Sequence, residues 1–217
     1  PVVRASSDTD GPTPLMSARD MGHVAVVELL LGAKAGVDAR NKTDMTALMF
    51  ASQSGNLDCT RALVAAGAQL NVQKEDGFTA FFFAVQNAHA KVAEWLLNEG
   101  ADINCQNKKK NTPLMRAAEH GSSETDDAVL RLLIDRAHRE DALELELTNE
   151  KGRTAVHAAC TGSATVALLR LLAARANPNV ADTQGMTPLH IASQVGDARL
   201  VRVLCAHGAD PDAATSE

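Results

Sequence analysis

The feature of the sequence that most restricts its fold is a short motif that returns at a constant interval. A threonine, then a small residue or proline, then an apolar residue occurs six times, beginning at Thr13, Thr46, Thr79, Thr112, Thr154 and Thr187. Successive motifs are 33 residues apart, except that 42 residues separate Thr112 from Thr154. A fixed period of this length indicates one supersecondary unit repeated along a single axis.

The residues around each motif predict two helices and a projecting loop. Threonine is a favourable N-cap and proline is tolerated at the first helical position, so each motif predicts a short helix such as 188–194. A second helix with an apolar stripe is expected at 23–31, 57–65, 90–98, 126–136, 165–174 and 198–206. An extended finger follows and turns at pairs such as Asp76-Gly77 and Gln184-Gly185, because glycine adopts the positive φ that these turns need.

Composition fits thin helical layers better than one large core. Aromatic residues make up only 3% of the 217 residues, whereas Ala and Leu are abundant. A single unit cannot bury its own apolar face, so six stacked units would share a continuous ribbon of small aliphatic side chains. The sequence therefore predicts an all-α repeat solenoid.

One repeat matches a known family pattern. Thr187-Pro188-Leu189-His190-Ile191-Ala192, followed by Gly196, Leu204 and Gly208-Ala209-Asp210, resembles the TPLHxA box and later positions of the ankyrin repeat, whose unit has 33 residues. The resemblance covers about residues 8–217 and implies a single domain, 1–217, of helix-turn-helix units with β-hairpin-like finger loops. It places repeats at about 8–40, 41–73, 74–106, 107–148, 149–181 and 182–214. It also implies that the box histidines, His157 and His190, form hydrogen bonds within the finger loops.

The fourth repeat contains about nine additional residues. Alignment assigns about four of them to the turn at 122–126 and the other five to the finger at 138–151. Ser123-Glu124-Thr125-Asp126 is typical of a capping box that opens the second helix. Phosphorylation of Ser123 or Thr125 is an alternative function for the same acidic segment. The alternation at 142–148 is compatible with an extra strand or a helical turn.

Candidate contact residues occupy positions that the repeat pattern leaves variable. The position that the TPLHxA box leaves free, marked x, holds Phe50, Phe83 and Arg116. These would form a stripe along the inner helices, and aromatic residues and arginine dominate interface energies. The two phenylalanines could instead wedge between repeats. The corresponding variable positions of the fingers hold Met45, Phe78, Arg153 and Met186.

Three consecutive lysines, Lys108, Lys109 and Lys110, lie on one predicted fingertip of an acidic chain. Lys110 stands where other turns have glycine, and a left-handed lysine costs about 1 kcal/mol or more. Either this tip relaxes to another turn type, or the lysines form an electropositive contact point.

Several classes of function are disfavoured. A net charge of −6 argues against a nucleic-acid partner, and no apolar run is long enough for a membrane span.

Metal and catalytic sites are also disfavoured. The four cysteines lie far apart in the sequence, which is unlike the local pairs of a zinc site. Among common catalytic motifs none is present, and Cys160 with His157 makes an improbable dyad because Cys160 falls at a packing position. We therefore expect a non-enzyme without cofactor or metal.

The remaining interpretation is a protein-interaction scaffold. We expect a monomer that binds a protein or peptide, acidic in character, through the concave groove of inner helices and fingertips. We expect it in the cytoplasm, with a nuclear location also compatible. The alternative is a regulatory or targeting segment of a larger enzyme, channel or transcription regulator, and the non-Met start makes us expect a piece of a longer protein. An enzyme with a pocket around Cys160 is the third hypothesis.

Overall fold

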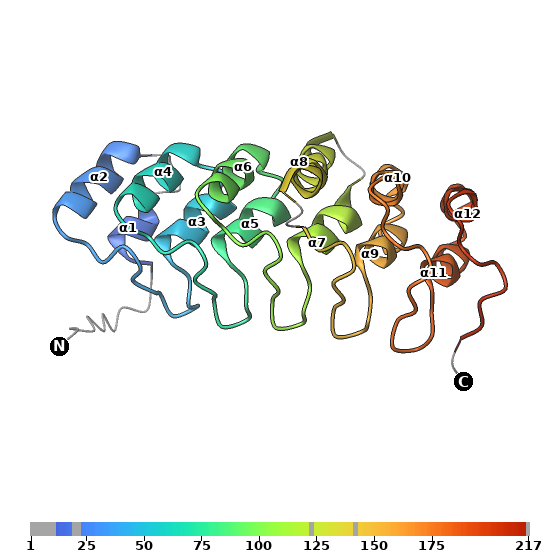
Figure 1. Cartoon of the computed structure of the whole chain (residues 1–217). Coiled ribbons are helices and arrows are strands. Elements are labelled where there is room, and N and C mark those ends of the chain that lie inside the picture. The colour runs from blue at the N-terminus through green and yellow to red at the C-terminus, as the bar shows by residue number, and fades with distance from the viewer. Residues whose placement is uncertain (1–11, 19–22, 122–123, 141–142, 216–217) are drawn as a thin grey trace.

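Pairs of helices follow one another in a row, and a loop projects from the same side of each pair (Figure 1). The computed structural model describes residues 12–18, 23–121, 124–140 and 143–215. The inner helices, next to the loops, are α1 (Pro14–Ser17), α3 (Ala47–Gln53), α5 (Ala80–Gln86), α7 (Pro113–His120), α9 (Ala155–Thr161) and α11 (Pro188–Val195). The outer helices are α2 (Val24–Gly32), α4 (Leu57–Ala65), α6 (Ala90–Asn98), α8 (Glu124–Glu140), α10 (Thr165–Ala173) and α12 (Ala198–Ala206).

This arrangement confirms the predicted α solenoid, and no strand occurs in the part of the chain that the structure describes. The threonine of each motif begins an inner helix. The backbone N–H of Phe82 donates to Oγ1 of Thr79 at 3.1 Å, and that of Met115 donates to Oγ1 of Thr112 at 3.1 Å. Each such cap satisfies one N–H that has no partner within the helix, and its loss costs about 1 kcal/mol.

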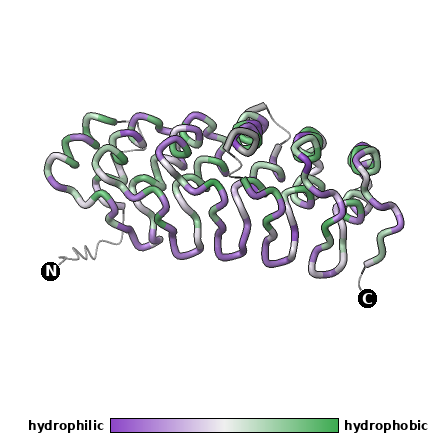
Figure 2. The backbone as a smooth tube through the Cα atoms, viewed as in Figure 1, coloured by the Kyte–Doolittle hydropathy of each residue, from purple (hydrophilic) through white to green (hydrophobic). Residues whose placement is uncertain are grey.

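The core is continuous along the row rather than centred in one place. Alanines at one inner-helix position let neighbouring helices approach closely, and all are buried: Ala51, Ala84, Ala117, Ala159 and Ala192. Leucines of the outer helices, among them Leu96, Leu133 and Leu168, close the same layer from the other side. Figure 2 shows hydrophobic residues along both helical layers, whereas the loops are mainly hydrophilic. Each repeat therefore depends on its neighbours for burial.

The projecting loops, called fingers here and numbered by the turns at 41–45, 74–78, 107–111, 149–153 and 182–186 as fingers two to six, share one turn geometry. In each, the first N–H donates to the fifth carbonyl and the fourth N–H donates to the first carbonyl. The fourth residue is left-handed in every case: Asp44 (φ 61°), Gly77 (87°), Lys110 (57°), Gly152 (72°) and Gly185 (76°). Lys110 thus keeps the glycine geometry, and the alternative that its tip relaxes to another turn type is wrong.

The additional residues of the fourth repeat lie mainly in a helix. Helix α8 has 17 residues, whereas the other outer helices have nine. Leu133 is fully buried like Leu96 of the preceding repeat, which supports the alignment across α8. The prediction of five extra residues in the finger is wrong, because the helix continues to Glu140 and the turn at 149–153 is of ordinary length.

Two expectations for this repeat fall on residues that are only partly described. Ser123 and the side chains of residues 124–126 lie outside the described residues, and with them the capping-box and phosphorylation hypotheses. Residues 143–148 form neither strand nor helix, so within them the acidic alternation marks the entry to an ordinary finger.

Candidate functional site

A groove of about 820 Å³ runs across fingers three, four and five and over the inner helices behind them. We call it the central groove. Its lining residues are Asp76, Phe78, Phe82, Gln86, Asn107, Lys108, Lys109, Asn111, Met115, Arg116, Glu119, Asn149, Glu150, Lys151, Arg153, Thr154, Ala158 and Thr161. Five basic and three acidic side chains contribute to this surface, so a chain with a net charge of −6 presents a locally positive groove.

The structure brings half of the predicted contact residues together in this groove. Phe78, Lys108, Lys109, Arg116 and Arg153 all line it. They come from three fingers and from α7, so residues separated by as many as 75 positions share one surface. The repeat makes this possible because equivalent positions of stacked units lie side by side.

The other predicted contact residues lie elsewhere. Met45 and Phe83 are buried, with 4% and 8% of their surface exposed, so an exposed contact role does not fit either of them. Phe50 is half-buried and packs against the core. Lys110 is exposed and Met186 is half-buried, and neither lines the central groove. The stripe of Phe50, Phe83 and Arg116 is therefore interrupted, and Phe83 takes the packing role that the alternative described.

Phe78 forms the aromatic wall of the groove because two other rings hold it. Its ring centroid lies 4.6 Å from that of Phe82 in an edge-to-face arrangement and 5.5 Å from that of Phe83 in a stacked one. Offset stacking and edge contacts of this kind contribute about 0.5–1.5 kcal/mol each beyond area burial. The buried Phe83 thus fixes the orientation of the half-buried Phe78.

The two arginines of the groove already have acidic partners. Arg116 pairs with Glu119 at 3.1 Å and also contacts His120. Arg153 pairs through Nε with Oδ2 of Asp182 at 3.0 Å. By contrast, no described acidic side chain forms an ion pair with Lys109 or Lys151, and Lys108 lies 3.9 Å from Glu75 at exposed positions.

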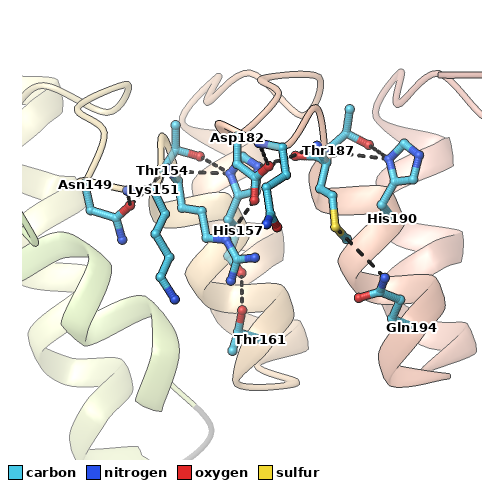
Figure 3. Close-up of polar contacts among 12 residues, drawn as sticks. Asn149, Lys151, Thr154, His157, Thr161, Asp182, Thr187, His190 and Gln194 are labelled. Carbon is cyan, nitrogen blue, oxygen red and sulfur yellow. Dashed lines mark hydrogen bonds and ion pairs between the residues drawn. The ribbon is translucent and has the colours of Figure 1, made fainter. Parts of the chain in front are cut away.

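Asp182 is the polar centre of finger six (Figure 3). Its Oδ1 accepts the N–H groups of Gln184 and Met186 at 2.9 and 3.0 Å. Burial by itself would raise the pKa of this carboxyl. The hydrogen bonds from Gln184, Arg153 and Met186 outweigh burial and hold the pKa of Asp182 below its usual range. A carboxylate thus remains charged inside the finger and keeps Arg153 in place.

The box histidines form the hydrogen bonds that the resemblance implies. In Figure 3, Nδ1 of His157 accepts the N–H of Thr154 at 3.1 Å, and Nδ1 of His190 accepts that of Thr187 at 3.1 Å. Methionine fills the same role in other repeats, where Sδ of Met16 and of Met115 lies 3.4 and 3.5 Å from the corresponding threonine N–H. Sequence reasoning missed this equivalence, although methionine at a box-histidine position was its signal.

The surroundings of Cys160 and His157 do not support a catalytic dyad. Burial raises the pKa of Cys160 to about 12, so its thiol stays protonated, and burial lowers the pKa of His157. Both ring nitrogens of His157 are already used, by Thr154 and Met186, and neither reaches Cys160. No group of three metal-ligating side chains occurs among the described residues, and no helix there could cross a bilayer.

Sequence reasoning did not identify several residues of the central groove. Lys151 occupies the fifth finger beside Arg153, and Asn107, Asn111 and Asn149 connect the walls, with Asn149 Nδ2 donating to Asn111 Oδ1 at 2.9 Å. The available signal was positional. Lys151 is the third residue of its turn, as Lys109 is one repeat earlier, and Asn107 and Asn149 are the first residues of the same two turns.

Comparisons with known proteins agree with this architecture. The family model described as ankyrin repeats in three copies matches residues 3–74, 66–141 and 125–215. The RelA-associated inhibitor of Mus musculus is 43% identical over 61 residues, which are 28% of this chain. The chain spans 7% of the length of the curated relatives it matches.

Two solved structures are similar over most of the chain. The crystal structure of the ankyrin repeat domain of Bcl-3, a member of the IkappaB family, matches with a TM-score of 0.82 and 27% identity, covering 95% of this chain and 91% of that one. A chain in the complex of the predatory endopeptidase Bd0816 from Bdellovibrio bacteriovorus with the immunity protein Bd3460 matches with a TM-score of 0.76 and 26% identity. This second match covers 90% of this chain and 98% of that one.

Proposed function

Because this chain belongs to the ankyrin-repeat family, we propose that it is a non-catalytic module that binds a protein partner of acidic character in its central groove. Ankyrin repeats are protein–protein interaction modules. The observation that carries the proposal is the groove itself. It combines a supported aromatic ring, Phe78, with two lysines, Lys109 and Lys151, whose side chains form no ion pair with any described residue. Aromatic anchors and positive charge are features of surfaces that bind acidic proteins.

The similar proteins support protein binding as the mode of action. One is named for its association with RelA, and another similar chain belongs to a complex of an endopeptidase with an immunity protein. Neither partner is transferred to this chain. The similarity supports only a shared mode of binding, in which a rigid row of repeats loses little conformational entropy when a partner binds.

The test is to obstruct the groove without disturbing the fold. Ala158 is a half-buried lining residue, and Ala158→Arg would place a long side chain in the groove. Arg61→Ala on the exposed side of α4 is a matched control. We expect retention of at least one protein from a cell lysate to fall about tenfold with Ala158→Arg and to stay unchanged with the control. Equal retention by both variants and the parent chain would contradict the proposal.

The remaining finer statements are also proposals. A monomeric state is one of them, and sedimentation would test it. A reducing compartment, cytoplasmic or nuclear, is supported by the four cysteines being unpaired. Imaging of the tagged full-length gene product would test the location.

A role as a regulatory or targeting segment within a larger protein is the second candidate. It is favoured by the curated relatives, in which the matching repeats make up 7% of the length. The complete open reading frame distinguishes the two candidates, because a neighbouring catalytic or channel domain would give the groove a regulatory target.

A further inference from the structure

We infer that the central groove takes an extended segment of a partner protein in which one aromatic or aliphatic side chain lies on Phe78 and carboxylates of Asp or Glu bind Lys108, Lys109 and Lys151. This inference rests on the proposed function and adds the chemistry of the partner. It is carried by three observations, which concern charge, rigidity and the aromatic wall.

The first observation is which cations remain available. Arg153 pairs with Asp182, whose side chain is only 1% exposed, so releasing it would leave a buried carboxylate unpaired. Arg116 is held by Glu119, and Asp76 is held by Lys74. Lys108 lies 3.9 Å from the exposed Glu75, a weak surface pair that a partner carboxylate can replace. The groove is then left with Lys108, Lys109 and Lys151 against Glu150, a positive excess that acidic side chains of a partner would match.

The second observation is that the lysines project from a hydrogen-bonded lattice of fingertips. The N–H of Lys108 donates to the carbonyl of Asp76 at 2.8 Å, joining fingers three and four. The N–H of Glu150 donates to the carbonyl of Lys109 at 3.1 Å, and that of Thr183 donates to the carbonyl of Lys151 at 2.9 Å. The backbone from which these lysines project is therefore ordered before a partner arrives, which lowers the entropy lost on binding.

The third observation is the position of Phe78 beside this lattice. Phe82 and Phe83 hold its ring from within the protein, and the exposed part of the ring lines the groove. A partner side chain laid on it would bury an apolar surface and gain ring contacts. An acidic segment without an apolar residue would leave the exposed face of Phe78 in contact with water.

The spacing of the repeats predicts how far apart the contact residues of the bound segment lie in its sequence. Packed helices lie about 8–10 Å apart, so a step from finger three to finger four, and again to finger five, is about 10 Å. An extended chain advances about 3.3 Å per residue. Acidic residues are thus expected about three and about six residues away from the apolar residue, towards fingers four and five respectively.

The experiment uses synthetic peptides titrated into the whole chain. The probe is a fluorescent peptide in a Gly-Ser background, with Phe and, about three and six residues away, Glu, made in both chain directions. One direction is expected to bind, and replacing its Phe by Ala or both Glu by Gln is expected to weaken binding at least about tenfold. A peptide of the same composition with both Glu beside Phe is expected to bind at least about threefold more weakly.

Protein variants locate the binding. The double variant Lys109→Glu with Lys151→Glu is expected to lose at least about tenfold in affinity, whereas Lys91→Glu, an exposed lysine of the outer helix α6, changes it less than about twofold. Phe78→Leu keeps an apolar residue for folding and is expected to weaken the Phe peptide. Thermal melts of each variant confirm that the fold is retained.

Equal binding of the Gln or Ala peptides, or an unaffected Lys109→Glu/Lys151→Glu double variant, would overturn this inference. No binding by any peptide, alongside protein capture that Ala158→Arg abolishes, would also overturn it and leave the proposed function standing. Protein capture that Ala158→Arg does not reduce would overturn both.

Discussion

His157 connects its own repeat to the next one through Met186, because its Nε2 lies 3.1 Å from the backbone carbonyl oxygen of Met186, 29 residues further along the chain. Its Nδ1 accepts the N–H of Thr154, since a backbone N–H can only donate. The proton of the neutral ring therefore lies on Nε2 and is donated to Met186. One side chain thus closes the finger turn and joins two repeats.

This buried histidine predicts a loss of stability in mild acid. Burial lowers the pKa of His157 in the folded chain, so as the pH falls below about 6.5 the unfolded chain binds this proton first. Acid then favours unfolding, with a slope of up to about 1.4 kcal/mol per pH unit until the pH reaches the folded pKa. Urea denaturation at a series of pH values between 7.5 and 5 measures this slope.

The matched variant is His157→Met, the residue that other repeats use. A sulfur at this position can still accept the N–H of Thr154, as Met115 does for Thr112. It cannot donate to Met186, whose carbonyl keeps the N–H of Asp182 as a donor at 2.9 Å. We expect a cost of about 1 kcal/mol at neutral pH and a flatter pH dependence. A slope equal to that of the parent chain would rule out His157 as its source.

Lys110 predicts a stabilising substitution at a fingertip. Its φ of 57° is one that glycine adopts without strain, and the left-handed conformation costs other residues about 1–2 kcal/mol. We expect Lys110→Gly to raise the free energy of unfolding by about 1 kcal/mol. Lys109→Gly removes the same charge at a residue without positive φ, and it should be destabilising by about 0.5–1 kcal/mol. Chemical denaturation measures the free energy of unfolding of both variants. A Lys109→Gly variant more stable than Lys110→Gly would contradict this prediction.

Gly162 lies at the end of α9, where its backbone is in close contact with α7. A Cβ at this position would overlap the backbone oxygen of Glu119, so Gly162→Ala must move α9 away from α7. We expect a loss of about 3 kcal/mol or more in unfolding free energy. Gly32→Ala in α2 is the control, because nothing lies within 4 Å of its Cβ, and alanine in a helix is favourable by about 0.5–1 kcal/mol.

The cysteines predict a simple pattern of thiol reactivity. Cys59, Cys105 and Cys160 are buried, and Cys205 is exposed. Burial raises the pKa of Cys105 and of Cys160 to about 12, so neither forms a thiolate at neutral pH. A thiol-directed reagent should modify Cys205 quickly in the native chain and the others only on unfolding. Rapid modification of Cys160 would revive the enzyme hypothesis.

Much of the fold could be predicted from the sequence because residues that begin and end helices recur at the same positions of successive repeats. The predicted ranges 57–65, 90–98 and 198–206 coincide with α4, α6 and α12. The insertion was harder, because charged residues suit a helix end and a solvated loop equally well, and α8 extends to Glu140 through the charged segment 136–140. Nothing local distinguishes these two outcomes.

The groove could be predicted only in part, for a physical reason. Finger register places Phe78, Lys109 and Arg153 on neighbouring tips, and the 33-residue period reveals this register. Whether a ring at a variable position faces solvent depends on its neighbours. Phe83 is buried and Phe78 stacks on it, and this pairing depends on side-chain geometry rather than on spacing.

A photo-crosslinking measurement tests the central claim most directly. A photoreactive phenylalanine analogue replaces Thr161, which lines the central groove, or Arg61, which is exposed on α4. The chain is then irradiated with the protein whose capture depends on the groove, and the adducts are counted by mass spectrometry. Crosslinking from position 161 but not from position 61 is the result that a groove-bound partner predicts. Crosslinking from position 61 alone would contradict it.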